Sequence, residues 1–553
     1  GVTVFVLFLL SLILNQRRKR KKLTEQIKNG YGRVPTRNYT EEELKKIESY
    51  YRKTGDGSRF TIDDITWNDL DMDTLYGFIN TCLSSIGDEV LYKILREPLL
   101  EPEKLNRRRE LIRFFETHEK EREAVSLIYA RIGRTKKFSL AEFLDSFRDV
   151  REVNPIRFLL PLALLIAAIA LFFFNVTWGI LGVVFVMILN ISTYFRLKGQ
   201  IEPWYVSMSA MAYLAGGGLE LAKLSVPELE PEISVIREDA GRLKSLKRRM
   251  RWLGAAGQGL LSLSVAEILM DYVRMITHLD FFMFYRMLKT IRTEENTVRR
   301  LMESMGSLEA MISIASYRQT LPYFTEGDFR TEGAVRVSFT DGYHPLIDDP
   351  VANGIENVGH LLLTGSNASG KSTFLRMSAL LVLLGETIAT IPASSFSSPY
   401  LRVYTSMALK DNLIGGESYF IVEIKSIKRI MDAFDNATPV FACIDEVLRG
   451  TNTVERVAAS TELLNDFAGR NGIVFAATHD IELTKLLTSY RQCHFEEFVT
   501  DNDVKFDYQL KEGPAKSRNA IRLLNLMGYD REVTDKAEAM AESFLENGTW
   551  KLS

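Results

Sequence analysis

A glycine-rich segment that ends in a lysine and a serine is the strongest chemical signal in the sequence. The segment 365–372 reads GSNASGKS; it follows the apolar run 360–364 and opens the helix-like stretch 372–385. Glycines at this spacing let backbone N–H groups surround a phosphate chain, and a helix N-terminus attracts the same anion. We therefore expect nucleotide phosphates to bind here. The expected contacts are Gly365, Ser366, Asn367, Ala368, Ser369, Gly370, Lys371, Ser372 and Thr373.

Two acidic residues give this segment a chemical partner. The lysine of the loop, Lys371, is expected to reach the β- and γ-phosphates, and Ser372 to ligate Mg²⁺. The apolar run 439–444 ends in Asp445 and Glu446. An acid at a strand end beside a phosphate loop holds Mg²⁺ or its waters, which we expect of Asp445, and Glu446 is free to polarise a water against the γ-phosphate. The pair favours hydrolysis over binding alone; the alternative is an ordinary strand end.

A histidine ends the next apolar run. His479 follows the segment GIVFAAT at 472–478. A single histidine is often structural, but a residue at a strand end beside the loop could also sense the γ-phosphate. Its position alone leaves both interpretations open.

These groups require an α/β domain to bring them together. Short apolar runs at 334–339, 360–365, 439–446 and 472–480 alternate with helical stretches, a pattern typical of a largely parallel sheet. The preceding segments 60–150 and 200–318 instead show apolar residues at intervals of three and four, as helices do. The expected domains are 1–15, a truncated transmembrane helix; 16–58, a basic cytoplasmic linker; 59–156, the first part of a helical core; 157–196, a transmembrane hairpin; 197–328, the second part of the core; and 329–553, the nucleotide-binding domain with C-terminal helices.

Two apolar regions predict a membrane anchor. Residues 1–14 carry no charge and precede the basic run 17–22, and the chain starts at Gly1 rather than Met, so we expect the end of a truncated span rather than a signal peptide. Residues 158–195 read as two apolar arms around the turn NVTWG, with positive charges at both ends. By the positive-inside tendency both ends lie in the cytoplasm, and the protein is expected in the inner membrane in contact with lipid. The alternative is a buried hairpin in a soluble core.

Composition restricts the remaining possibilities. The 553 residues include 69 Lys and Arg against 71 Asp and Glu, so overall charge indicates no partner. The three cysteines form no CxxC pair, which predicts no zinc site and a reducing compartment. The basic stretch 243–254 is either a solvated surface or a contact to a phosphate backbone.

Five motifs occur in an order that resembles a known family. They are TGSNASGKSTFLR from 364, TIPASSFS at 390–397, ESYFIVEIKSI at 417–427, CIDEVLRGTNT at 443–453 and FAATHDIEL at 475–483. This set is similar to the ATPase domain of the MutS family, DNA mismatch-repair ATPases of the ABC superfamily. The resemblance implies an α/β P-loop ATPase domain of ABC type at the C-terminus, after an all-α core interrupted by the transmembrane hairpin.

The resemblance also implies roles for single residues. ATP and Mg²⁺ are the expected ligands, with Asn367 facing the phosphates, Asp445 at the metal and Glu446 as the hydrolytic base. His479 matches the family's strand-end histidine, which favours a catalytic role. The match of Ser418 implies that a second copy presents this serine to the γ-phosphate, so that the chain forms a homodimer through the ATPase domain.

The sequence differs from the family outside the ATPase domain, so the resemblance does not decide whether the protein acts on DNA. A span and a linker stand where mismatch-sensing domains would be, and the hairpin interrupts the helical core. One hypothesis is a membrane-anchored, MutS-like ATPase that binds duplex or branched DNA in mismatch repair or recombination. The alternative is a membrane-coupled ATPase switch or scaffold with no DNA role. An ordinary ABC transporter half is disfavoured because the spans are too few and the Leu-Ser-Gly-Gly-Gln signature is missing.

Overall fold

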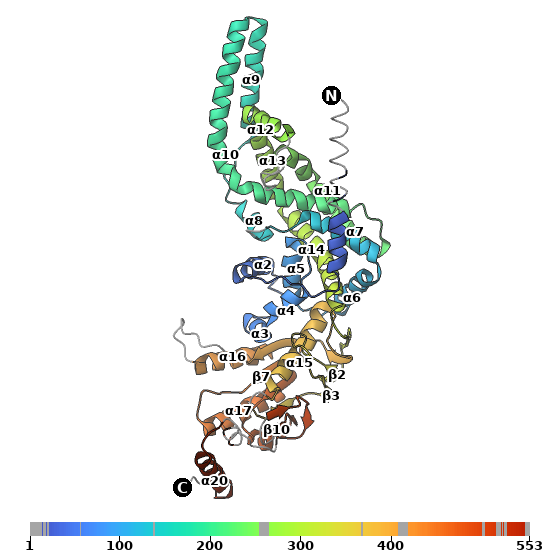
Figure 1. The fold of residues 1–553 in the computed structure, drawn as a ribbon, viewed down its shortest axis with the longest axis vertical. Coiled ribbons are helices and arrows are strands. Elements are labelled where there is room, and N and C mark those ends of the chain that lie inside the picture. The colour runs from blue at the N-terminus through green and yellow to red at the C-terminus, as the bar shows by residue number, and fades with distance from the viewer. Residues whose placement is uncertain are drawn as a thin grey trace. The chain divides into compact units, whose positions relative to one another are not determined.

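The computed structural model describes the chain as two compact units. The described residues are 14, 18, 21–55, 57–135, 139–253, 265–366, 369–407, 419–499, 504–515, 521, 524 and 528–547. A helical unit combines Gly1–Asp56, Ile79–Lys93 and Glu110–Gln319, and an α/β unit combines Gly57–Phe78, Ile94–Arg109 and Thr320–Ser553. The helical N-terminal part and the mixed α/β C-terminal part agree with the predicted fold classes (Figure 1).

The helical unit is built around one long buried helix. That helix, α14 (Glu295–Arg318), is buried on nearly every side over its last two turns, and it packs against α7 and α11. Methionines and leucines fill its core face, including Met302, Met305 and Leu308. The other helices are α2 (Glu41–Thr54), α5 (Ser85–Arg96), α6 (Pro102–Thr117), α7 (Glu119–Ile132), α8 (Leu140–Ser146), α9 (Leu160–Ala170), α10 (Val176–Leu221), α11 (Glu230–Leu253), α12 (Val265–Thr277) and α13 (Leu279–Thr293), with 3₁₀ turns η1 (Pro155–Leu159), η2 (Leu171–Phe173) and η3 (Pro227–Leu229).

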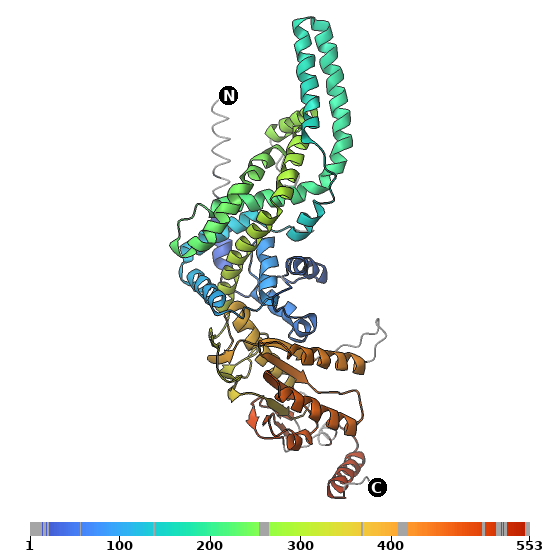
Figure 2. The same ribbon diagram turned by 180° about the vertical axis from the view of Figure 1, so that it is seen from behind.

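The predicted apolar hairpin is a pair of antiparallel helices. The first arm is η1, α9 and η2, and the second arm is the first half of α10. Asn175 separates them and caps α10, because its side chain accepts hydrogen bonds from the N–H groups of Thr177 and Trp178. Segments Pro155–Phe173 and Val176–Gly199 are both long and apolar enough to cross a membrane, and only 11% and 17% of an apolar 18-residue stretch in each is buried. Seen from behind, the two arms stand side by side, and no other described helix covers their far ends (Figure 2).

The helix that contains the second arm extends beyond the predicted hairpin. The predicted hairpin closes at residue 196, whereas α10 continues through Pro203 to Leu221 without a break. The return arm and a core helix are therefore parts of one continuous helix of 46 residues, with Pro203 in its interior.

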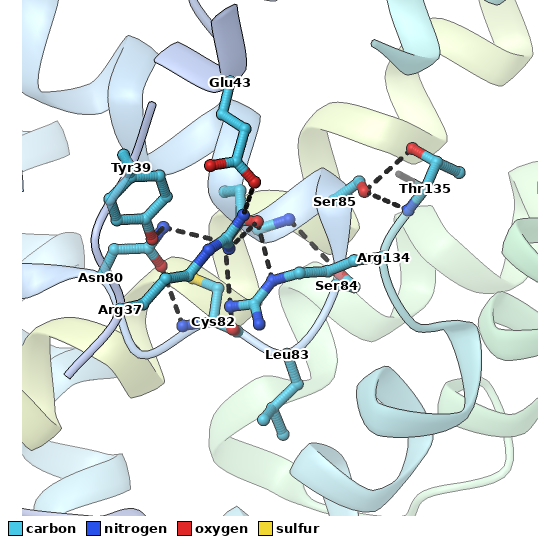
Figure 3. A network of polar contacts seen from close by, with 12 residues as sticks. Arg37, Tyr39, Glu43, Asn80, Cys82, Leu83, Ser84, Ser85, Arg134 and Thr135 are labelled. Carbon is cyan, nitrogen blue, oxygen red and sulfur yellow. Dashed lines mark hydrogen bonds and ion pairs between the residues drawn. The ribbon is translucent and has the colours of Figure 1, made fainter. Parts of the chain in front are cut away.

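The segment predicted as a linker contributes to the helical core. Its helix α2 begins with a capping box between Thr40 and Glu43, and it buries Ile47 and Tyr50. Just before α2, Arg37 donates a hydrogen bond to Asp88 at 3.1 Å, within a polar network that also contains Arg134 (Figure 3). The grouping of the chain thus differs from the predicted domain boundaries, since the end of the linker folds with the core and residues 57–78 and 94–109 fold with the α/β unit.

The α/β unit contains a six-stranded sheet in the order β12-β9-β4-β8-β7-β6. All neighbouring pairs are parallel except β9 with β12. A four-stranded sheet, β1-β5-β2-β3, and the β10-β11 pair complete the strands described here. The strands are β1 (Asp328–Arg330), β2 (Val337–Gly342), β3 (Asn353–Val358), β4 (Leu361–Thr364), β5 (Ser395–Pro399), β6 (Arg402–Ser406), β7 (Val440–Asp445), β8 (Gly472–Ala477), β9 (Arg491–His494), β10 (Glu497–Val499), β11 (Val504–Phe506) and β12 (Lys511–Glu512).

The helices of this unit cover the central strands. The core helix α15 contacts β6, β7 and β8, and almost every residue beyond its first turn is buried. Because β4, β7 and β8 are parallel neighbours, their carboxyl ends meet at one edge of the sheet. The helices are α3 (Asp64–Asp69), α4 (Met72–Ile79), α15 (Lys371–Ile388), α16 (Tyr419–Ala433), α17 (Thr453–Ala468), α18 (Leu483–Leu486) and α20 (Arg531–Asn547).

Candidate nucleotide site

The glycine-rich segment connects the buried strand β4 to the start of α15. Its two end glycines adopt positive φ angles, +139° at Gly365 and +111° at Gly370. A Cβ atom at Gly365 would lie 2.7 Å from the backbone oxygen of Phe495. A side chain at this position is therefore excluded by both conformation and space. The glycines allow the turn that brings the loop beside the N-terminus of α15.

The lysine of the loop is buried against the loop itself. Lys371 is only 5% exposed, and its Nζ donates hydrogen bonds to the carbonyl oxygens of Gly365 (2.9 Å) and Ser366 (2.7 Å). Burial lowers the pKa of Lys371, and the negative charges of Asp445 and Glu446 oppose this change. An ammonium group in this position, at a helix N-terminus, is suited to contact an anion.

A hydroxyl and a carboxylate meet at the carboxyl end of β7. Ser372 Oγ donates a hydrogen bond of 2.5 Å to Asp445 Oδ2, while Asp445 Oδ1 is buried without a partner among the described residues. Burial raises the pKa of Asp445, and the hydrogen bond from Ser372 opposes the increase. A buried carboxylate oxygen that lacks a donor fits a divalent cation, and oxygen ligands are those that Mg²⁺ prefers.

A second buried polar atom lies in the loop. Ser369 Oγ is also without a partner among the described residues, and Ser369 is 1% exposed. Buried hydroxyls are rarely left unpaired in folded proteins, because the lost hydrogen bond to water costs free energy. A phosphate oxygen would satisfy this donor.

The acid that follows β7 is held by two basic side chains. Glu446 has a positive φ of 58°, and its N–H donates to the carbonyl oxygen of Ala477 at 3.0 Å. His479 Nε2 lies 2.9 Å from Glu446 Oε1, and Arg449 pairs with the other carboxylate oxygen. Burial works to raise the pKa of Glu446, but the hydrogen bond from His479 and the nearby cations bring it below the usual value. Glu446 is therefore ionised at neutral pH.

A cavity of about 550 Å³ opens beside the loop, which is a size typical of small-molecule sites. Two aromatic side chains, Phe495 and Tyr508, line it together with the start of α15. His344 also lines it, and burial together with the charge of Arg376 lowers the pKa of this histidine to about 4, so it is neutral at pH 7.

The structure brings most of the predicted residues to one edge of the sheet. Lys371, Ser372, Asp445, Glu446 and His479 share direct contacts or neighbouring charges, as described above. Ser369, Gly370 and Thr373 line the adjoining cavity. Asn367, Ala368 and Ser418 lie outside the described residues, and their roles stay predictions.

Sequence reasoning missed several residues of the site. Arg449 lies only three residues after Glu446, inside the motif at 443–453, and was not singled out, whereas Phe495 and Tyr508 belong to the region around the last strands. Spacing from the loop gives no signal for the two aromatic residues, since only the fold of the sheet places them beside it. Glu497, which accepts a hydrogen bond from Ser366, was missed for the same reason.

The structure is that of a mixed α/β unit in which a glycine-rich loop lies beside an acidic strand end. Residues 361–545 match the model of the family described as MutS domain V. Over this part the resemblance to the MutS family that the motifs indicated is confirmed.

Three curated relatives illustrate the similarity. DNA mismatch repair protein MutS 2 of Haloarcula marismortui is 28% identical over 47% of this chain and 30% of its own length. DNA mismatch repair protein MutS of Thermotoga petrophila is 26% identical over 50% of this chain and 35% of its own. The protein of the same name from Thermus aquaticus is 32% identical over 38% of this chain and 27% of its own. The match thus spans about a third of these relatives.

Proposed function

We propose that this protein binds ATP with Mg²⁺ and hydrolyses it to ADP and phosphate. The observation that carries the proposal is the cluster at the carboxyl ends of β4, β7 and β8, where Lys371, the Ser372–Asp445 pair and the Glu446–His479 pair come together. Each group has the chemistry that phosphoryl transfer to water requires. The relatives named as mismatch repair proteins support the same assignment.

Each side chain has a defined task in this proposal. A water attacks the γ-phosphorus while the bond to the β-phosphate oxygen breaks, and Glu446 accepts the proton of the water. His479 holds the carboxylate of Glu446 in place, and Lys371 together with the loop N–H groups stabilises the charge on the phosphates. Ser372 and Asp445 would hold the magnesium ion, which when bound neutralises charge on the β- and γ-phosphates.

The apolar hairpin supplies the second part of the proposal. We infer that Pro155–Phe173 and Val176–Gly199 anchor the chain in the inner membrane, with both units in the cytoplasm, because the arms are apolar and nearly uncovered. The ATPase domain would dimerise around ATP, with Ser418 of each copy completing the other's site. DNA is the proposed partner, since the relatives are DNA mismatch repair proteins; the alternative is a membrane-coupled switch without DNA, which the hairpin favours.

Phosphate release by the purified full chain tests the enzymatic proposal. We expect Glu446→Gln to lower the rate by about 10²-fold or more, since it removes the base, while ATP binding is retained. Lys371→Ala should lose both binding and turnover. Glu462→Gln, an exposed change of the same type on α17, is the matched control and should hydrolyse at the wild-type rate.

The same assay tests both the assignment of the catalytic base and the choice between DNA and lipid as the partner. Wild-type turnover by the Glu446→Gln protein would remove the assignment of the base. Adding duplex and branched DNA to the same assay, and separately lipid vesicles, distinguishes the two partner proposals: stimulation by DNA supports a DNA-directed ATPase, and stimulation by vesicles alone supports the membrane-coupled switch.

A further inference from the structure

The helix α12 has an unusual distribution of apolar and polar side chains. Three apolar residues on one face, Leu269, Tyr272 and Val273, are 61%, 56% and 43% exposed. Its arginine is instead turned inward: Arg274 is 9% exposed and forms an ion pair of 2.5 Å with Asp271. A helix on a water-facing surface has the opposite arrangement, with its apolar stripe against the core. The exposed face of α12 is therefore suited to a non-aqueous environment.

This helix lies against the apolar hairpin. It packs against both α9 and α10, and Figures 1 and 2 show it beside the hairpin's lower part. Asn190 of α10 fixes the contact, because its side-chain Nδ2 donates to the carbonyl oxygens of Ile276 (2.7 Å) and Pro161 (3.2 Å). The ring of His278, directly after α12, hydrogen-bonds to the backbone oxygen of Asn190 at 2.9 Å. Asn190 is 2% exposed, so these contacts satisfy a polar group inside an apolar segment.

The position of Asn190 gives the depth of this contact. It stands 15 residues beyond Asn175 at the turn, which corresponds to roughly 22 Å along an α-helix. The hydrocarbon core of a bilayer is about 30 Å thick, and Trp178, which is 66% exposed next to the turn, suits the far interface. The C-terminal end of α12 thus reaches inside the near boundary of the same hydrocarbon layer.

The hairpin carries exposed apolar side chains close to this level. Leu160 on α9 is 60% exposed, and Leu189 on α10, next to Asn190, is 41% exposed. Together with the apolar face of α12 they form a belt of exposed apolar residues at the base of the hairpin. The belt consists of Leu160, Leu189, Leu269, Tyr272 and Val273.

We propose that α12 is an interfacial helix that inserts its apolar face into the cytoplasmic leaflet of the bilayer, where Asn190 locks it to the hairpin. This inference rests on the proposed membrane anchoring and adds a third lipid-contacting element to it. The lipid-facing stripe of amphipathic helices in membrane interfaces has the same composition, with leucine and aromatic residues. The lock makes α12 and the return arm one body at the membrane surface.

Spin labelling of the full chain in phosphatidylethanolamine–phosphatidylglycerol vesicles tests the inference. The three native cysteines are buried, so a label can be attached at one introduced cysteine. Leu269→Cys is the test site; Phe185→Cys on the hairpin and Glu238→Cys on α11 are the lipid and water controls, at positions that are well exposed. Collision with oxygen, which enters lipid, is compared with collision with a water-soluble nickel chelate.

We expect the ratio of the oxygen collision rate to the nickel collision rate to be severalfold higher for the label at 269 than for the label at 238. This ratio should be close to that of the label at 185. If the label at 185 has a high oxygen-to-nickel ratio while the label at 269 has the same low ratio as the label at 238, α12 lies in water. This result would overturn the inference about α12 and leave the proposed membrane anchor intact. If 185 also matches 238, the membrane anchor itself is wrong.

A second variant tests the lock. Asn190→Leu keeps the side-chain size but removes the donor to Ile276. It should lower the oxygen-to-nickel collision ratio of the label at 269 and leave that of the label at 185 unchanged. An unchanged label at 269 would overturn the role of Asn190.

Discussion

A buried carboxyl group in the helical unit shows how one residue joins distant segments. Glu309 on α14 accepts hydrogen bonds from the N–H groups of Leu83 (2.6 Å) and Ser84 (3.0 Å), just before α5 begins, and from the Ser84 hydroxyl. The contact requires a glycine, because a Cβ at Gly87 would lie 2.2 Å from Glu309 Oε2. Burial raises the pKa of Glu309 to about 7, and the charge of Asp88 adds to the increase.

This residue predicts a pH-dependent stability. Because the pKa of Glu309 is higher in the folded than in the unfolded state, its contribution is full below the unfolded pKa of about 4.5 and is lost as pH rises through 7. The loss amounts to about 3 kcal/mol. Glu309→Gln keeps an acceptor for both N–H groups, so its free energy of unfolding should fall less between pH 5 and pH 8 than that of the wild type. Denaturant unfolding at the two pH values measures this.

The control for this experiment is Glu238→Gln on α11, where the side chain is 63% exposed. It should follow the wild-type pH dependence. Equal pH dependence of the Glu309→Gln and wild-type proteins would show that this carboxyl group titrates normally.

At the residue scale, the site residues that could be predicted from the sequence are those that stand next to one another in the chain. The loop and the Asp445–Glu446 pair could be predicted because strand-end position and spacing determine where they lie. Their partners could not, since Glu497 reaches Ser366 only through the fold of the sheet, and nothing in the sequence marks Arg449, three residues after Glu446, as the partner of that carboxylate. The positive φ of Glu446, which aims its carboxylate at His479, likewise has no sequence signal.

At the scale of elements, the α/β unit takes up a short helix from far back in the chain. Asp69, at the end of α3, is 5% exposed, and its Oδ2 accepts hydrogen bonds from Thr405 Oγ1 (2.7 Å) and the N–H of Met407 (3.0 Å) at the end of β6. Thr66 accepts a further bond from the N–H of Thr405. The edge strand β6 is thus held by α3.

This connection predicts that residues 57–78 stabilise the α/β unit. Asp69→Ala should lower the unit's stability by about 2 kcal/mol, because a buried backbone N–H and a hydroxyl lose their acceptor. The corresponding fall in Tm is about 4–8 °C for a unit of this size. Differential scanning calorimetry of the full chain in detergent measures it.

A matched change at an exposed acid provides the comparison. Asp435→Ala removes a surface ion pair with Arg470, in which the aspartate is 75% exposed, and should shift Tm little. Equal shifts for the two variants would argue against a structural role of α3 in this unit.

Strands and helices differed in how well they could be predicted. The apolar runs of β4, β7 and β8 are completely buried parallel strands, so composition alone identifies them. The helix α2 was placed in a linker, because its exposed face is rich in Glu and Lys and only Ile47 and Tyr50 are buried. The continuation of α10 to Leu221 was not predicted, because the charges after residue 195 mark the end of the apolar segment and carry no signal for the end of the helix.

At the scale of the whole molecule, the proposed nucleotide site lies in the α/β unit and the proposed membrane hairpin lies in the helical unit. The two units are interleaved in sequence, since 57–78 and 94–109 belong with the nucleotide site while their neighbours belong with the hairpin. The chain therefore passes between the two units several times.

The central claim is that ATP is bound at the Lys371–Asp445 cluster and closes a dimer. The most direct measurement is the mass of the Glu446→Gln protein in detergent, by light scattering after size exclusion, with and without Mg-ATP. The account predicts twice the chain's 63.0 kDa with Mg-ATP, after subtraction of detergent, and a single chain without it. A single chain under both conditions, with no ATP retained, would contradict it.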